Sequence, residues 1–207
     1  TFQRHERHMR GIPLSEAFRP FEPHEKEAHT LRTFEHSVAP GLFQTEDYAQ
    51  SILATFPDIT ADVVKERVAG RMERQAILRR DDPPPPHIWA VLDEHVLNRS
   101  IGGSAVMAAQ MERMAELART PRINIQVIPA EVEHPGLMGA FVIAETRQSP
   151  AIVFMENASD GQTVEDAEMA AKMTVLFDSL RMEALTGSAS LKLIEEAAQR
   201  WKEQIAP

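Results

Sequence analysis

Hydrophobic residues recur at helical spacing between about positions 22 and 80. In the longest such stretch they return every four residues, at Val64, Val68, Met72 and Ala76. Because one helical turn takes 3.6 residues, side chains at this spacing share one face of a helix. We therefore expect three helices, at about 22–31, 46–55 and 60–78, the last capped by Thr60. Residues 1–20 show no such period, and we expect a linker or tail there.

After residue 86 the pattern changes to short apolar runs, which are typical of strands. We expect strands at 87–92, 123–128, 140–144 and 151–155. The second run alternates apolar and polar residues and should have one wet face, whereas the last two are almost entirely apolar and should be central. The four residues Arg147-Gln148-Ser149-Pro150 make a hairpin-length connection, so these last two strands should be antiparallel.

Three more helices are expected in the second half of the chain. One is capped by Ser104 and runs to about residue 120, one spans about 166–184, and the last is capped by Ser188. Strands in the middle with helices at both ends predict an α+β fold, in which a helical N-terminal lobe packs on a lobe with a small, largely antiparallel sheet flanked by helices. The expected core comprises Trp89, Val91, Val127, Phe141, Ile143, Val153, Phe154, Leu176, Phe177 and Trp201.

A run of four prolines, Pro83 to Pro86, is the clearest boundary in the chain. Consecutive prolines cannot be helical and form a stiff extended spacer. We expect a linker or tail over 1–20, a helical lobe over 21–82, and an α+β lobe that senses an effector or binds a partner over 83–207. The alternative is one continuous domain over 21–207.

The net charge of −9 arises after residue 80. Residues 1–80 hold 12 basic and 12 acidic residues, whereas 81–207 hold 10 and 19. An acidic surface repels phosphate, so we do not expect these 207 residues to bind duplex DNA. The chain has no cysteine, which excludes disulfides and fits a cytoplasmic location. No apolar run approaches the 18 or so residues that suggest a membrane span.

No motif in the chain indicates a cofactor, a metal or a catalytic nucleophile. The spacings of a P-loop, a dinucleotide fingerprint, a G-x-S-x-G elbow and an S-x-x-K pair are all missing. Asp93, Glu94 and His95 are adjacent, which should splay their side chains, and no metal site is expected. Glu156 and Asp160 are a carboxylate pair suited to acid–base work, although solvated loop carboxylates are the commoner case.

Three features suggest where a ligand or partner would bind. Residues 65–80 carry an excess of four positive charges beside the Pro40-Gly41 turn, which suggests a docking surface for an acidic partner. Eight of the ten methionines lie after residue 100, and flexible thioethers suit adaptable grooves, although plain core packing is the commoner explanation. The His134-Pro135-Gly136 loop is a candidate pocket rim. The candidate ligand- or partner-binding residues are Phe43, Arg71, Arg74, Met107, Met111, His134, Phe141 and Met173.

Alternatives remain open at the arginines and at Phe43. The commoner explanation is that Phe43 is core and that the arginines are solvated or paired with Glu66 and Glu73. If the arginines form a docking surface, replacing Arg71 and Arg74 together with alanine should leave the melting temperature nearly unchanged while weakening partner association.

Several blocks, in order, carry a family resemblance. The most distinctive is Val38-Ala39-Pro40-Gly41-Leu42-Phe43-Gln44-Thr45-Glu46-Asp47-Tyr48-Ala49. Others are Trp89 to Glu94, Ile125 to Pro129, His134-Pro135-Gly136 and Gly139-Ala140-Phe141. Together they resemble a domain attached to helix-turn-helix regulators of actinobacteria, the WhiJ-type, antitoxin-like transcription factors.

The resemblance implies a regulatory context for the chain. In that family a helix-turn-helix precedes the domain, and neighbouring genes often encode a small partner protein. No helix-turn-helix is present in these 207 residues, so DNA binding would belong to a module outside them. The resemblance therefore implies a domain that senses a small molecule or protein partner, and a homodimer is expected because such regulators read paired half-sites. The alternative is a small hydrolase-like enzyme that uses carboxylate or histidine groups.

Overall fold

Six strands form one mixed sheet in the computed structural model, which describes residues 18–57, 59–147, 150–156 and 161–205. The strands are β1 (Thr30–Glu35), β2 (His87–Asp93), β3 (Ile123–Ile128), β4 (Phe141–Glu145), β5 (Ile152–Glu156) and β6 (Gly161–Val164). Their order across the sheet is β3-β2-β1-β4-β5-β6. β1, β2 and β3 run parallel, and the pairs from β1 to β6 are antiparallel. With helices on both faces, the fold is α+β, as the hydrophobic pattern predicted.

The central strand β1 corrects the sequence prediction. A helix was expected over 22–31, but α2 (Glu22–Glu27) ends early and Thr30 begins β1. This strand pairs with β2 on one side and β4 on the other, so the expected helical lobe contributes a strand to the middle of the sheet. Polar residues at 32, 33 and 35 interrupt the apolar pattern by which a buried strand is predicted from sequence. Buried on both faces, β1 nevertheless packs Leu31 and Phe34 into two different clusters.

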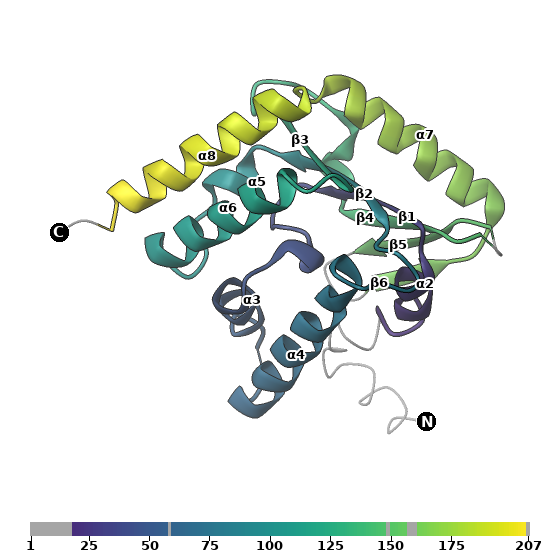
Figure 1. Cartoon of the computed structure of the whole chain (residues 1–207), viewed down its shortest axis with the longest axis horizontal. Coiled ribbons are helices and arrows are strands. Elements are labelled where there is room, and N and C mark those ends of the chain that lie inside the picture. Colours follow the sequence, from purple (N-terminus) through teal and green to yellow (C-terminus); the bar gives the residue numbers. More distant parts are fainter. Residues whose placement is uncertain (1–17, 58, 148–149, 157–160, 206–207) are drawn as a thin grey trace, which may run out of the picture.

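Helices cover the two faces of the sheet unequally. α7 (Ala167–Glu183) covers one face, where its Phe177 and Leu180 pack on Phe34 and Val91. The other face is covered by α6 (Ser104–Ala118) and α8 (Gly187–Glu203), which pack against each other and on β3. α3 (Glu46–Leu53) and α4 (Ala61–Arg74) lie on the opposite side of the sheet from α7 (Figure 1). Three 3-10 turns and one short helix complete the described elements: η2 (Gly41–Phe43), η3 (Gln75–Leu78), η4 (Pro135–Met138) and α5 (His95–Asn98).

Helix caps confirm some expectations and correct two. The Thr60 hydroxyl accepts a hydrogen bond from the Val63 amide at the start of α4, as predicted. At α6 the cap position is Gly103, with a φ of 88°, and Ser104 is already helical. At α8 the capping hydroxyl belongs to Thr186, which accepts from the Ala189 amide, and not to Ser188. The actual cap lies one residue before the expected one at α6 and two residues before it at α8, and both residues have the non-helical backbone that a cap requires.

Most of the predicted core is buried. The predicted strands at 123–128, 140–144 and 151–155 correspond to β3, β4 and β5, and the last two pair antiparallel near the middle of the sheet. Trp89 and Leu176 are only half-buried, whereas the other eight predicted core residues are buried. Trp89 lies under the guanidinium of Arg181, whose central carbon is 4.5 Å from the ring centroid. Among the described residues, no helix has the length and hydrophobicity needed to cross a membrane.

Candidate ligand-binding cleft

The distinctive segment at 38–49 forms a loop whose polar side chains fold back onto its own backbone. Gln44 donates its side-chain amide to the Ala39 carbonyl at 2.7 Å, and the Ala39 amide donates to the Tyr48 hydroxyl at 3.1 Å. Burial raises the pKa of Tyr48 to about 12, so its hydroxyl stays neutral. The Thr45 hydroxyl caps α3 through the Tyr48 amide. These residues therefore fix the conformation of the loop.

Two distant glutamines hold the same loop from outside. Gln75 donates to the Gln44 carbonyl at 2.7 Å. Gln110, from α6, donates to the Phe43 carbonyl at 3.0 Å and accepts from the Thr45 amide at 2.8 Å. Both side chains are buried, and such hydrogen bonds satisfy backbone groups that have no secondary-structure partner. The loop is thus a rigid wall rather than a mobile cover.

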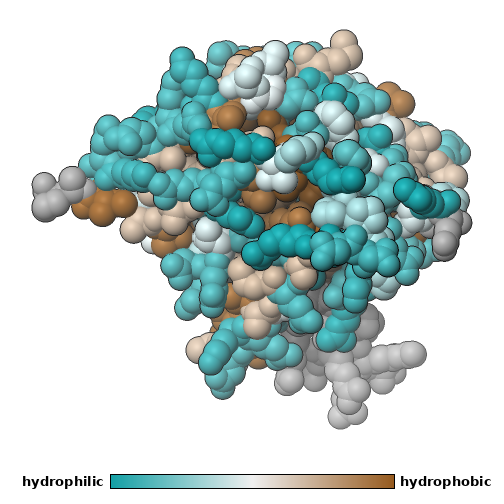
Figure 2. All heavy atoms as spheres, in the orientation of Figure 1, coloured by the Kyte–Doolittle hydropathy of each residue, from teal (hydrophilic) through white to brown (hydrophobic). Residues whose placement is uncertain are grey.

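That wall borders a cleft of about 900 Å³, the size of many small-molecule sites. The cleft lies between the 37–44 loop, α2, α4 and the sheet face formed by β1, β4 and β5. Apolar side chains from the strands contribute to its wall: Leu31, Ile88, Val142 and Phe154. Hydrophobic side chains reach the surface near the middle of one face of the molecule, between α4 and the strands in this view, among hydrophilic neighbours (Figure 2).

Glu35 is the most unusual residue in the cleft. It ends β1, and strand alternation places it on the same face as Leu31 and Thr33. Glu35 and Thr33 are each only 5% exposed, yet Glu35 Oε2 and Thr33 Oγ1 have no hydrogen-bond partner among the described residues. Burial raises the pKa of Glu35 well above its ordinary value of 4.5, the charge of Glu156 raises it further, and Arg71 opposes both.

Arg71 and Glu156 complete the charged part of the cleft. Arg71 projects from α4 and donates to the Gln44 side-chain oxygen at 2.6 Å. Burial and the neighbouring Arg74 lower the pKa of Arg71 to about 10. Glu156, the last residue of β5, remains exposed at the mouth of the cleft, and desolvation by its surroundings raises its pKa against the opposing charges of Arg71 and Arg74.

Arg74 is engaged inside the fold. Its guanidinium forms two hydrogen bonds of 2.9 Å with the carboxylate of Glu25, which is 3% exposed, and it stacks over the Phe18 ring at 3.8 Å. The partner is therefore Glu25 of α2, and neither Glu66 nor Glu73. This pair ties α4 to α2 across the cleft. Replacing Arg74 would leave a buried carboxylate unpaired, which contradicts the expectation of an unchanged melting temperature.

The remaining predicted site residues do not converge. Phe43 lies along the cleft wall but is fully buried, so it is not available as an exposed aromatic anchor. Met107 and Met111 are fully buried between α6 and its neighbours. Phe141 and the half-buried Met173 pack on the opposite face of the sheet, in the cluster under α7. The structure thus brings only Phe43, Arg71 and Arg74 to the cleft, together with Glu35, which the sequence interpretation missed.

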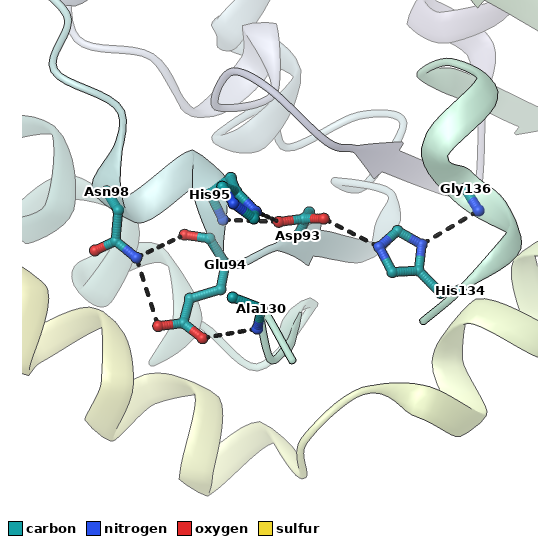
Figure 3. A network of polar contacts seen from close by, with 7 residues as sticks. All are labelled: Asp93, Glu94, His95, Asn98, Ala130, His134 and Gly136. Atoms are coloured by element: carbon teal, nitrogen blue, oxygen red, sulfur yellow. Dashed lines mark hydrogen bonds and ion pairs between the residues drawn. The ribbon is translucent and has the colours of Figure 1, made fainter. Parts of the chain in front are cut away.

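His134 belongs to a separate polar network on the α7 side of the sheet. Asp93 lies between two imidazole rings, with His134 Nε2 at 3.0 Å and His95 Nδ1 at 2.7 Å (Figure 3). Adjacent Asp93 and His95 were expected to diverge, but the chain turns into α5 immediately after β2, and their side chains meet. Burial raises the pKa of Asp93, but hydrogen bonds from the His95 backbone and both rings outweigh it, so the net pKa is lowered.

The hydrogen bonds fix the tautomer of His134 and indicate a structural role. Its Nδ1 accepts from the Gly136 amide at 3.2 Å, so the ring proton is on Nε2 and points at Asp93. Both ring nitrogens are occupied, and the ring is buried. The contact anchors the 134–138 loop to the end of β2. In the part of the chain that the structure describes, no three histidine, aspartate or glutamate side chains are grouped to hold a metal.

The structure is an α+β domain with a cleft lined by both polar and apolar side chains. The chain matches the model of a family described as "Domain of unknown function (DUF5753)" over residues 18–196, and it belongs to that family. No curated protein matches the chain. The family match includes both the loop that walls the cleft and the strands that line it.

Proposed function

We propose that this domain is the effector-sensing part of a DNA-binding transcriptional regulator. The observation that carries the proposal is the cleft, in which Glu35, a 5% exposed carboxylate, offers an oxygen without a partner. A fold gains nothing from a buried acceptor that lacks a donor, whereas a binding site does. The resemblance of the 38–49 segment to domains of helix-turn-helix regulators supports the link to DNA.

Signal transfer is proposed to pass through the elements that close the cleft. α2 and α4 stand on either side of it and are joined by the Arg74–Glu25 pair. A ligand between them would favour one spacing of the two elements over another, and this differential affinity is what shifts a regulator between states. α2 is also the first helix that the structure describes, and it lies on the N-terminal side of the domain, where the resemblance implies a DNA-binding module.

A large side chain that fills the cleft tests whether the domain senses an effector there. Gly70 lies on α4, lines the cleft and has open space where a side chain would start. In the natural gene product that carries this domain, Gly70→Trp should fix the expression of an operator-controlled reporter in one state. Gly70→Ala, which leaves the cleft open, is the matched control and should regulate normally. A folded Gly70→Trp protein that still regulates like the wild type would refute the proposal.

The alternative, a small hydrolase-like enzyme, has one observation in its favour. Glu35 and Glu156 both have raised pKa values in one cleft, and perturbed carboxylates often serve as general acids. The other candidate, His134, is bonded at both ring nitrogens and is not free to act as a base. Turnover of p-nitrophenyl esters or glycosides that disappears in Glu35→Gln would favour the enzyme over the sensor.

A further inference from the structure

The cleft contains a place prepared for a hydrogen-bond donor. Glu35 Oε2 and Thr33 Oγ1 are on the same face of β1, two residues apart, and both are buried without a partner among the described residues. When Glu35 is ionised its carboxylate only accepts hydrogen bonds, so a group that binds and stabilises this form must donate. Because the 37–44 loop is tied down by Gln44, Gln75 and Gln110, the wall is not free to collapse and supply that donor.

A second carboxylate points to the charge of the missing group. The β1–β4 register pairs Phe34 with Phe141, so Glu35 falls beside Ala140, whose carbonyl accepts from the Glu156 amide at 3.0 Å. Glu35 and Glu156 thus flank Ala140 across neighbouring strands, with backbones about 10 Å apart. Both line the cleft, and their mutual repulsion contributes to the raised pKa of Glu35.

The wider cleft also carries an excess of negative charge. Its lining includes the six glutamates Glu22, Glu25, Glu35, Glu66, Glu73 and Glu156, against four arginines. Arg74 is paired with Glu25 through two hydrogen bonds, whereas Arg71 is bonded to the neutral Gln44 side chain and keeps a positive charge that acts on Glu35 and Glu156. An anionic ligand would meet this excess unfavourably, whereas a cation would offset it.

We propose, resting on the sensing function above, that the effector is a small organic cation: a protonated amine on an apolar body. Glu35 and Thr33 receive the ammonium hydrogens, with Glu156 as the outer carboxylate. The apolar body lies against Leu31 and Phe154, which line the same sheet face. Binding is noncovalent, and it gives the buried Glu35 oxygen the hydrogen-bond donor that it lacks in the free protein.

Three small molecules of similar shape test whether the cleft prefers a positively charged ligand. Benzylamine, benzyl alcohol and benzoate differ at the polar group and share a ring. In NMR titrations of the whole chain at pH 7, benzylamine should bind saturably, at least tenfold more tightly than the alcohol, and benzoate should not bind. Chemical-shift changes should centre on residues 31–35 and 154–156. Glu35→Gln should weaken benzylamine at least tenfold and leave the alcohol unchanged, and Glu156→Gln should have a smaller effect in the same direction.

The outcomes separate this inference from the proposed function. If amine and alcohol bind equally and Gly70→Trp abolishes both, the cleft is a ligand site but not a cation site, and the inference fails alone. Preference for benzoate, or unchanged benzylamine affinity in a folded Glu35→Gln protein, also overturns it. If none of the probes binds and reporter control survives Gly70→Trp, both the inference and the proposed function fail.

Discussion

Removing the charge of Glu35 should stabilise the ligand-free protein. Glu35→Gln keeps the shape of the side chain and eliminates an ionisable group that is 5% exposed and lacks a partner at Oε2. Evolution retains such a destabilising group where function needs it, so a stabilised variant that has lost binding is the signature of a site residue.

The size of the effect follows from the direction in which the pKa moves on folding. The folded-state pKa of Glu35 lies above its ordinary value of 4.5, because of burial and then Glu156. Well below pH 4.5 the carboxyl group is neutral in both states, so its ionisation costs no stability. As the pH rises through the folded pKa, the folded state loses stability, by about 1.4 kcal/mol for each pH unit that separates the folded and unfolded pKa values. With the usual cost of an unpaired buried group, we expect about 1–3 kcal/mol in favour of Glu35→Gln at pH 8 and almost none at pH 4.

Urea unfolding of both proteins at pH 4, 6 and 8 measures this difference. The other carboxylates titrate in both chains and cancel when the free energies of unfolding are subtracted. Glu131→Gln, at an exposed position, is the control for removing a carboxylate in general. A Glu35→Gln protein that is less stable than the wild type at pH 8, or a difference that does not change with pH, would show that Glu35 is ionised and well paired in the free protein.

Four further variants test the packing and the polar contacts by urea or thermal unfolding. Gly136→Ala should cost about 1–3 kcal/mol, because its new carbon would lie 2.3 Å from the Phe34 ring. Gly70→Ala should instead stabilise α4 by about 1 kcal/mol, since it meets open space in a helix; a loss there would show an unseen clash. Arg74→Ala should cost about 2–4 kcal/mol by leaving Glu25 buried and unpaired, and an unchanged melting temperature would refute the pair. Asp93→Ala should cost about 1–3 kcal/mol at pH 7 and less at pH 3. The lowered pKa of Asp93 stabilises the fold above pH 3.8, and this contribution is lost on acidification. An equal cost at both pH values would contradict this reasoning.

The secondary structure was predictable where one pattern dominated. The apolar runs that became β4 and β5 and the four-residue period of α4 both identified their elements. β1 was missed because Arg32, Thr33 and Glu35 interrupt its hydrophobic positions. β6 was missed because its four residues, Gly161 to Val164, are too short for a period to show.

The candidate site was harder to predict because its residues become neighbours only in the folded sheet. Glu35 and Glu156 are far apart in sequence, and strand order places them beside Ala140. Glu156 was singled out as a carboxylate, but with Asp160, which lies outside the described residues. The 38–49 segment was recognised as distinctive, yet its role as a wall clamped by Gln75 and Gln110 depends on contacts that no local pattern reveals. A charged residue within an otherwise buried strand was the one available signal.

The most direct test is the titration of the Glu35 carboxyl carbon by NMR, assigned by comparison with Glu35→Gln and repeated with saturating benzylamine. The free protein should show a Glu35 pKa above 4.5, and the bound amine should lower it, because a cation favours the ionised carboxylate. A pKa at or below 4.5 in the free protein, unmoved by the amine, would contradict the account of this cleft as a site for a cationic effector.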